Sequence, residues 1–144
     1  MDSGSYICRE NENGTYTGIY CHWDCELFSC GELLLKHYSD REKLNVLLAL
    51  GNLSTLGSRI EPDLNFEHGF EYDLRQPDVC VFYGRERGDA DASAKTFSLK
   101  DIPNTIRFCY IYTLKNSWVY FRPNQKREYL ILRELKLTSV GVRG

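Results

Sequence analysis

The dipeptide Asn13-Gly14 constrains this 144-residue chain more than any other feature of its sequence. Asn-Gly favours the tight turn of a β-hairpin, and here it lies between two β-prone runs, residues 5–9 and 15–22. In the second run two sets of side chains alternate: Tyr16, Gly18 and Tyr20 against Thr17, Ile19 and Cys21. Because successive side chains of a strand point to opposite faces, aromatic rings are expected on one face and small apolar groups on the other. We therefore predict that the domain opens with a β-hairpin.

The hydrophobic period changes after this hairpin from that of a strand to that of a helix. Apolar residues fall at helical spacing over residues 31–38, which predicts a short helix there. Residues 40–50 carry a stripe of leucines and follow a capping box, in which Ser39 and Glu42 satisfy free amides at a helix start. Gly51 is placed to end this second helix in a left-handed conformation. Two short helices are therefore expected after the first hairpin.

β-prone segments return in the second half of the chain. Residues 57–77 are polar and irregular, and we expect them to form a loop. Three regions after it are predicted to be strands: residues 79–83, the arms 106–114 and 118–122 of a second hairpin, and 128–138, where strand context decides an ambiguous period. Hairpins on either side of a helical segment are typical of an α+β fold. We predict a single α+β domain over residues 1–144, with a mostly antiparallel sheet built from the N-terminal and C-terminal hairpins.

The charge balance and the lack of long apolar runs narrow the classes of partner. Lys and Arg number 18 and Asp and Glu number 20, for a formal charge of -2, so strong nucleic-acid binding is not expected. The longest apolar stretches fall far short of the roughly 20 residues that cross a bilayer. Residues 1–10 lack the basic start and apolar core of a signal peptide. We therefore expect a cytoplasmic protein that does not bind a membrane, and we predict no cofactor.

Six cysteines are present, and in a reducing compartment we expect them to remain thiols. A zinc site is the alternative for those near the first hairpin, because sulfur and imidazole are the ligands that zinc prefers. The four candidate ligands are Cys21, His22, Cys25 and Cys30. Neighbouring residues of a strand point to opposite faces, which keeps Cys21 and His22 from sharing an ion without a bend. Free thiols are the favoured interpretation.

Four longer motifs occur along the first part of the chain: GIYCHWD at residues 18–24, HYSDRE at 37–42, LGNLSTLG at 50–57 and FYGRERG at 82–88. Their order and spacing resemble those of a family of small uncharacterised proteins encoded mainly by bacteriophages and prophages. The resemblance covers roughly the first 95 residues. In that family glycine and tyrosine follow the Trp-Asp pair, where this chain has Cys25 and Glu26. The resemblance implies a phage origin, action in the cytoplasm of a bacterial host, a compact α+β domain and no established catalytic activity.

The end of the first hairpin also offers groups for nucleophilic catalysis. A thiolate, a base and an orienting carboxylate can be chosen from a small set. Those candidates are Cys21, His22, Asp24, His37 and Asp40. In the structural interpretation, Trp23 anchors the hairpin in the core and Asp24 accepts backbone amides in a turn. The structural interpretation suits these residues at least as well as the catalytic one.

A third candidate is a site for phosphate or for a nucleotide. Residues 84–88 place two arginines on a flexible turn directly after a buried strand, and guanidinium groups match phosphate oxygens. Tyrosines nearby can stack on a base. The predicted ligand-binding residues are His22, Asp24, Arg41, Tyr83, Arg85 and Arg87. The alternative is a solvated turn in which Arg85 or Arg87 pairs with Glu86 or Asp89.

These observations favour binding over catalysis. We predict a non-enzymatic phage accessory protein that modulates the host, or counters a host defence, by binding a host protein or a nucleotide signal. Ten tyrosines are compatible with docking onto a protein, and assembly into a homo-oligomer is left open. The alternative is a small hydrolase or transferase acting on a nucleotide or phosphoester, which would use His22 or His37 with Asp24 or Asp40 and the arginine loop at residues 84–88.

Overall fold

Ten strands and three α-helices make up the part of the chain that the computed structural model describes, residues 4–23, 26–62, 76–123, 133–138 and 141–143. The strands are β1 (Ser5–Glu10), β2 (Tyr16–Trp23), β3 (Leu53–Thr55), β4 (Val81–Phe82), β5 (Lys95–Phe97), β6 (Phe108–Tyr112), β7 (Trp118–Phe121), β8 (Arg133–Glu134), β9 (Lys136–Thr138) and β10 (Gly141–Arg143). The helices are α1 (Glu32–His37), α2 (Arg41–Leu50) and α3 (Tyr83–Arg87), with a π-helical turn η1 (Leu27–Gly31) and a 3-10 turn η3 (Leu99–Asp101). This is an α+β fold, as predicted.

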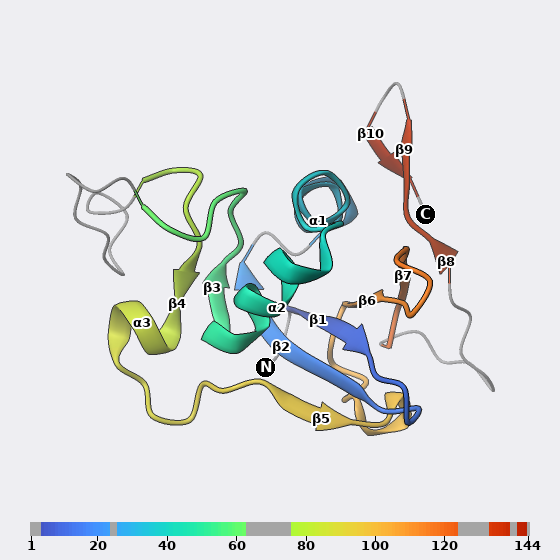
Figure 1. Cartoon of the computed structure of the whole chain (residues 1–144), viewed down its shortest axis with the longest axis horizontal. Coiled ribbons are helices and arrows are strands. Elements are labelled where there is room, and N and C mark those ends of the chain that lie inside the picture. The colour runs from blue at the N-terminus through green and yellow to red at the C-terminus, as the bar shows by residue number, and fades with distance from the viewer. Residues whose placement is uncertain (1–3, 24–25, 63–75, 124–132, 139–140, 144) are drawn as a thin grey trace.

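Eight of the strands form one mixed sheet in the order β4-β3-β2-β1-β6-β7-β8, with β5 added beside β2 (Figure 1). Both predicted hairpins, β1–β2 and β6–β7, are present. They are joined by a parallel pairing of β1 with β6, and β2 is also parallel to β3. The other pairs of the sheet are antiparallel. The sheet is thus mostly antiparallel, and its two parallel contacts connect segments that are distant in the sequence.

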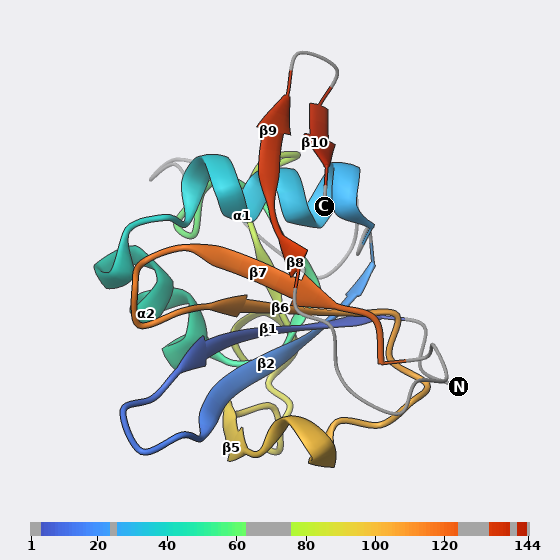
Figure 2. The same cartoon turned by 90° about the vertical axis from the view of Figure 1, so that its right-hand side faces the viewer.

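Apolar groups cover both faces of this sheet. On one face α1 and α2 pack over β2 and its neighbours, and the segment that carries β5 and η3 lies on the other (Figure 2). The alternation along β2 separates the two layers: Ile19 and Cys21 join the core under the helices, whereas Tyr16 and Tyr20 pack with the second cluster. The aromatic and aliphatic faces predicted for the first hairpin are therefore confirmed.

The start of α2 differs from the predicted capping box. The Asp40 side chain, not that of Ser39, accepts the free amide of Glu42, over 3.4 Å. Ser39 instead donates its hydroxyl to the Leu35 carbonyl, 2.7 Å away, at the end of α1. Because α1 ends so close to α2, Ser39 is used by the first helix and the cap passes to the next residue.

The secondary structure predicted from sequence differs most from the observed structure in the segment after β4. Residues 84–88 were expected to form an irregular turn, but Tyr83–Arg87 form the helical turn α3, which ends at Gly88 in the left-handed conformation. The predicted strand 79–83 is correspondingly shortened to β4. Two other predicted segments lie largely outside the described residues, the loop 57–77 and the first part of the strand 128–138.

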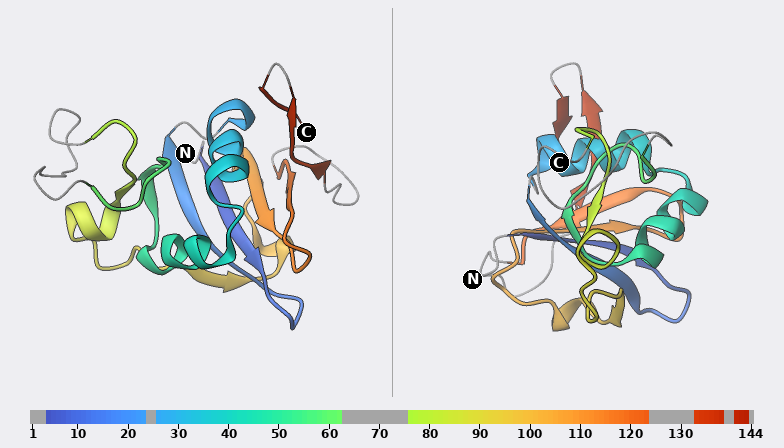
Figure 3. Two further views of the ribbon diagram at one scale, coloured as in Figure 1. Left: turned by 45° about the horizontal axis from the view of Figure 1, so that its top comes forward. Right: turned by 90° about the vertical axis from the view of Figure 1, so that its left-hand side faces the viewer.

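Among the described strands, β9 and β10 pair only with each other, and they stand away from the main sheet (Figure 3). The described helices are short, and none is both long and apolar enough to cross a membrane.

Candidate functional site

The conspicuous cluster at the end of β2 is divided between the two faces of the sheet. Cys21 is fully buried, whereas His22 lies on the opposite face and its Nδ1 is 3.1 Å from the Tyr20 hydroxyl. Trp23 is 59% exposed and packs edge-on against the His22 ring. The expectation that Trp23 anchors the hairpin in the core is therefore wrong. Cys21 takes the inward position on this strand, and Trp23, as the last residue of β2, lies at the rim of the sheet. Asp24 lies outside the described residues.

The candidate metal ligands are placed unequally. Cys21 and Cys30 both belong to the apolar core under the helices, and His22 projects from the other face of β2. Cys25 lies outside the described residues. Within the described ranges, no three His, Cys, Asp or Glu side chains gather in a way that could hold a metal ion. The five described cysteines, Cys8, Cys21, Cys30, Cys80 and Cys109, are buried free thiols.

The groups considered for catalysis are not linked to one another. His37 is exposed in the last turn of α1, and Asp40 caps α2. Among the described residues, no hydrogen bond joins His22, His37 and Asp40. Each of these side chains instead lies on a different element.

Arg85 on α3 is enclosed by the protein's own polar groups. Its side chain is 17% exposed, and its Nε lies 2.5 Å from Oε1 of Glu86, whose side chain is fully buried. The guanidinium also donates to the carbonyls of Ile60 and Cys80, over 2.9 and 3.1 Å. It lies 4.9 Å from the centre of the Phe82 ring. Arg85 thus pairs with Glu86, as in the alternative to a phosphate site, but the pair lies largely buried on a helical turn and not on the solvated turn expected there.

Arg87 follows the same pattern at the surface, where its Nε lies 3.2 Å from Oδ1 of Asp89. Arg41 is distant from both arginines of α3, because it contacts the β6–β7 turn. In the sheet, β4 and β6 are four strand steps apart, roughly 19 Å at the usual spacing. Figures 1 and 3 show α3 beyond one edge of the sheet and β6–β7 toward the other. The predicted ligand-binding arginines therefore do not converge.

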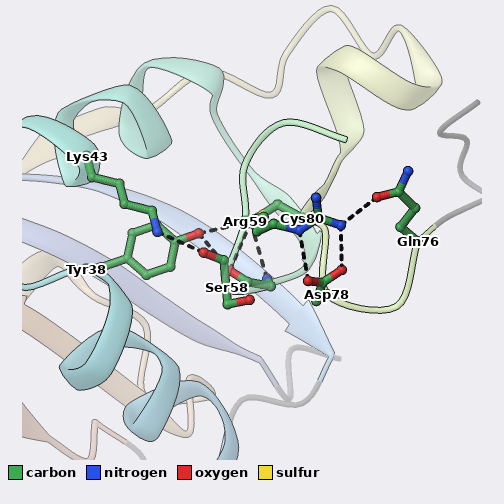
Figure 4. A network of polar contacts seen from close by, with 8 residues as sticks. Tyr38, Lys43, Ser58, Arg59, Gln76, Asp78 and Cys80 are labelled. Carbon is green, nitrogen blue, oxygen red and sulfur yellow. Dashed lines mark hydrogen bonds and ion pairs between the residues drawn. The ribbon is translucent and has the colours of Figure 1, made fainter. Parts of the chain in front are cut away.

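A buried polar network lies between α2 and the segment before β4 (Figure 4). The Tyr38 hydroxyl donates to the Gly57 carbonyl, 2.6 Å away, and lies 3.3 Å from the Cys80 sulfur. Lys43 covers the Tyr38 ring and donates to the Ser58 carbonyl over 2.8 Å. Burial raises the pKa of Tyr38, and burial also raises the pKa of the Cys80 thiol. Both groups therefore stay protonated at neutral pH and act as structural hydrogen-bonding groups.

Beside this network, Arg59 holds a second polar cluster, in which Arg59 and Asp78 are partly exposed and Gln76 is buried (Figure 4). Its guanidinium donates hydrogen bonds to both carboxylate oxygens of Asp78, over 2.8 and 2.9 Å, and to Oε1 of Gln76 over 2.6 Å. The hydrogen bonds from Arg59 lower the pKa of the Asp78 carboxyl. This cluster fastens the chain before β4, where Arg59 and Val79 form an isolated bridge.

A concave surface, which we call the hairpin-tip groove, lies where the tips of both hairpins meet α2. Its volume is about 830 Å³. Figure 2 shows the β1–β2 tip, the β6–β7 tip and α2 on the same side of the molecule. The groove is lined by Arg9, Glu10, Asn11, Glu12, Asn13, Thr15, Arg41, Asn45, Thr96, Leu114 and Asn116. Four asparagines, two arginines and two glutamates thus face one opening, and Leu114, 46% exposed, adds an apolar side chain.

Neutral oxygens hold the two arginines of the groove in place. Arg9 donates to the side-chain carbonyls of Asn45 and Asn11. Arg41 donates from Nη2 to the Thr113 carbonyl and to Asn116, each over 3.0 Å, with its guanidinium 5.1 Å from the centre of the Tyr112 ring. Of the candidate site residues predicted from sequence, Arg41 is the one that lines the groove. The run of polar residues 10–13 was interpreted only as a turn, and it supplies four of the groove's side chains.

The comparisons with known proteins identified no relative of this chain. Searches of protein-family models, curated proteins and solved structures found no match to this chain. The resemblance to small phage proteins therefore remains a prediction from sequence.

Proposed function

We propose that this chain is a non-enzymatic phage accessory protein that acts in the cytoplasm of a bacterial host, where it modulates the host or counters a defence by binding a host protein in the hairpin-tip groove. The observation that carries the proposal is the lining of the groove. Asparagine amides donate and accept hydrogen bonds at once, and they suit the peptide groups and polar side chains of a protein surface. Leu114 supplies an apolar contact inside a polar rim, an arrangement typical of protein interfaces.

A protein partner fits these features better than a nucleotide does. The two arginines and two glutamates of the groove balance in charge, whereas a nucleotide carries several negative charges. No aromatic side chain lines the groove within the described residues, so no stacking surface for a base is present there. Arg85 and Arg87, the other candidates for phosphate contacts, are paired with Glu86 and Asp89.

Two experiments, a nucleotide incubation and a pull-down from bacterial cells, test this proposal against the nucleotide and enzyme alternatives. The purified protein is first mixed with cyclic and linear nucleotides, separated from unbound material, denatured and analysed by chromatography. We expect no nucleotide to be retained and none to be converted, and a tagged copy expressed in bacterial cells to retain a host protein at a fixed molar ratio. Retention of an intact nucleotide would support a nucleotide sponge, and catalytic turnover of any nucleotide or phosphoester would refute the non-enzymatic proposal.

A further inference from the structure

Neither arginine of the hairpin-tip groove is paired directly with a described carboxylate, although Glu10 and Glu12 line the same groove. Arg9 and Arg41 form no ion pair with any described residue, although other arginines in the described part of the chain do, such as Arg59 and Arg85. Among the described residues, their hydrogen bonds go only to the uncharged oxygens of asparagine side chains and of one backbone carbonyl. Such bonds fix the direction of a guanidinium and leave its charge uncompensated.

Both guanidiniums also have N–H groups that make no hydrogen bond to a described residue. A guanidinium has five N–H groups. In Arg41 the described hydrogen bonds use only Nη2, and in Arg9 they use Nη1 and Nη2. The Nε–H groups of both residues and the Nη1 group of Arg41 therefore make no hydrogen bond within the described ranges.

Asn45 brings the two arginines together. It lies one helical turn after Arg41 on α2, a spacing at which side chains are neighbours. Its side-chain oxygen accepts from Arg9, which comes from β1, and all three residues line the groove. Asn45 is exposed, and its side-chain amide group carries an uncharged donor.

We infer that Arg9, Arg41 and Asn45 form a receptor for a single carboxylate, the side chain of an aspartate or glutamate in an extended segment of the partner protein. This inference rests on the proposed function and specifies the chemistry of its partner. Carboxylates accept two parallel hydrogen bonds from a guanidinium, which gives both strength and direction. The site thus selects an acidic residue at one position of the bound segment.

The glutamates of the groove restrict the ligand to one negative charge. Glu10 is held by the Leu114 amide, which donates to its Oε1 over 2.9 Å, and Glu12 is exposed at the hairpin tip. A phosphate ester or a run of acidic residues would place further negative charge against these carboxylates. A peptide with one acidic side chain avoids this repulsion and can present its backbone N–H groups, or a basic neighbour, to Glu10 and Glu12.

An array of random heptapeptides, with a glutamine copy of every acidic peptide, tests the inference. We expect the bound peptides to share one Asp or Glu position, and the glutamine copies to bind roughly 10-fold more weakly, because a charged hydrogen-bonding pair is lost. The variants R9Q and R41Q should lose this preference. The variant R133Q, which removes the same charge from exposed β8 outside the groove, should keep it.

Several results would overturn the inference. These are bound peptides with no shared acidic position, an acidic preference that R9Q and R41Q retain, and displacement of the peptides by AMP or inorganic phosphate more readily than by acetate. If R9Q or R41Q fails to fold, the glutamine copies of the peptides still decide the question with the unaltered protein. If a host protein binds the wild type but no peptide does, only this inference is refuted. If neither a host protein nor a peptide binds, the proposed function is refuted as well.

Discussion

Replacing Arg85 by alanine is expected to lower the free energy of unfolding by about 3 kcal/mol, because it removes the cation paired with a buried carboxylate. The side chain of Glu86 is fully buried beside Arg85, and it also accepts the Phe82 amide over 2.6 Å. The same substitution removes the donors to the carbonyls of Ile60 and Cys80. Chemical denaturation monitored by tryptophan fluorescence measures this loss.

Arg87→Ala is the matched control, since it removes the same type of side chain from the same helical turn. Arg87 and Asp89 are both largely exposed, and exposed ion pairs contribute little, so a loss of about 0.5 kcal/mol or less is expected. Equal effects of the two substitutions would contradict the structural role of Arg85. In that case the phosphate-site interpretation of this segment would regain support.

Gly51→Ala is expected to be at least as damaging, with a loss on the order of 4 kcal/mol. Gly51 ends α2 with a φ of 89° and a ψ of -158°, a region that residues with side chains rarely enter. A Cβ atom added there would lie 2.1 Å from the Ala92 carbonyl oxygen. That oxygen accepts the Asn52 amide over 2.7 Å, so the two segments cannot separate without losing this hydrogen bond.

Gly14→Ala separates backbone strain from steric overlap. Gly14 has a similar φ of 84° in the β1–β2 turn, and a Cβ added there would meet nothing within 4 Å. Only the strain of a left-handed residue is expected, about 1 kcal/mol. Thermal unfolding of the two variants should therefore differ clearly. Similar melting temperatures would show that the close approach of Gly51 to Ala92 does not exist in solution.

The parts of the fold that follow from local chemistry were predicted from the sequence. Asn13-Gly14 located the first hairpin, and the leucine stripe located α2. The parallel pairing of β1 with β6 was not predicted, because it joins residues about 100 positions apart and no local pattern records it.

Site prediction from sequence favoured residue types that often carry chemistry, and this emphasis explains its errors. Cys21 and His22 are neighbours in the sequence, but strand alternation sends them to opposite faces. Arg85 was expected to meet a ligand, and a buried glutamate one residue away satisfies it instead. The asparagines of the groove carry no charge and match no ligand-binding motif, and they come together only through the tertiary arrangement of two hairpins and a helix.

The central claim is that the hairpin-tip groove is the surface that contacts a host protein, and site-specific photocrosslinking tests it most directly. A photoreactive phenylalanine analogue is placed at Leu114, inside the groove, or at Phe28, which is 71% exposed on η1 outside it. After irradiation of expressing bacterial cells, we expect one crosslinked host protein with the probe at position 114 and none at position 28. Crosslinking to that host protein from position 28 alone would contradict the claim.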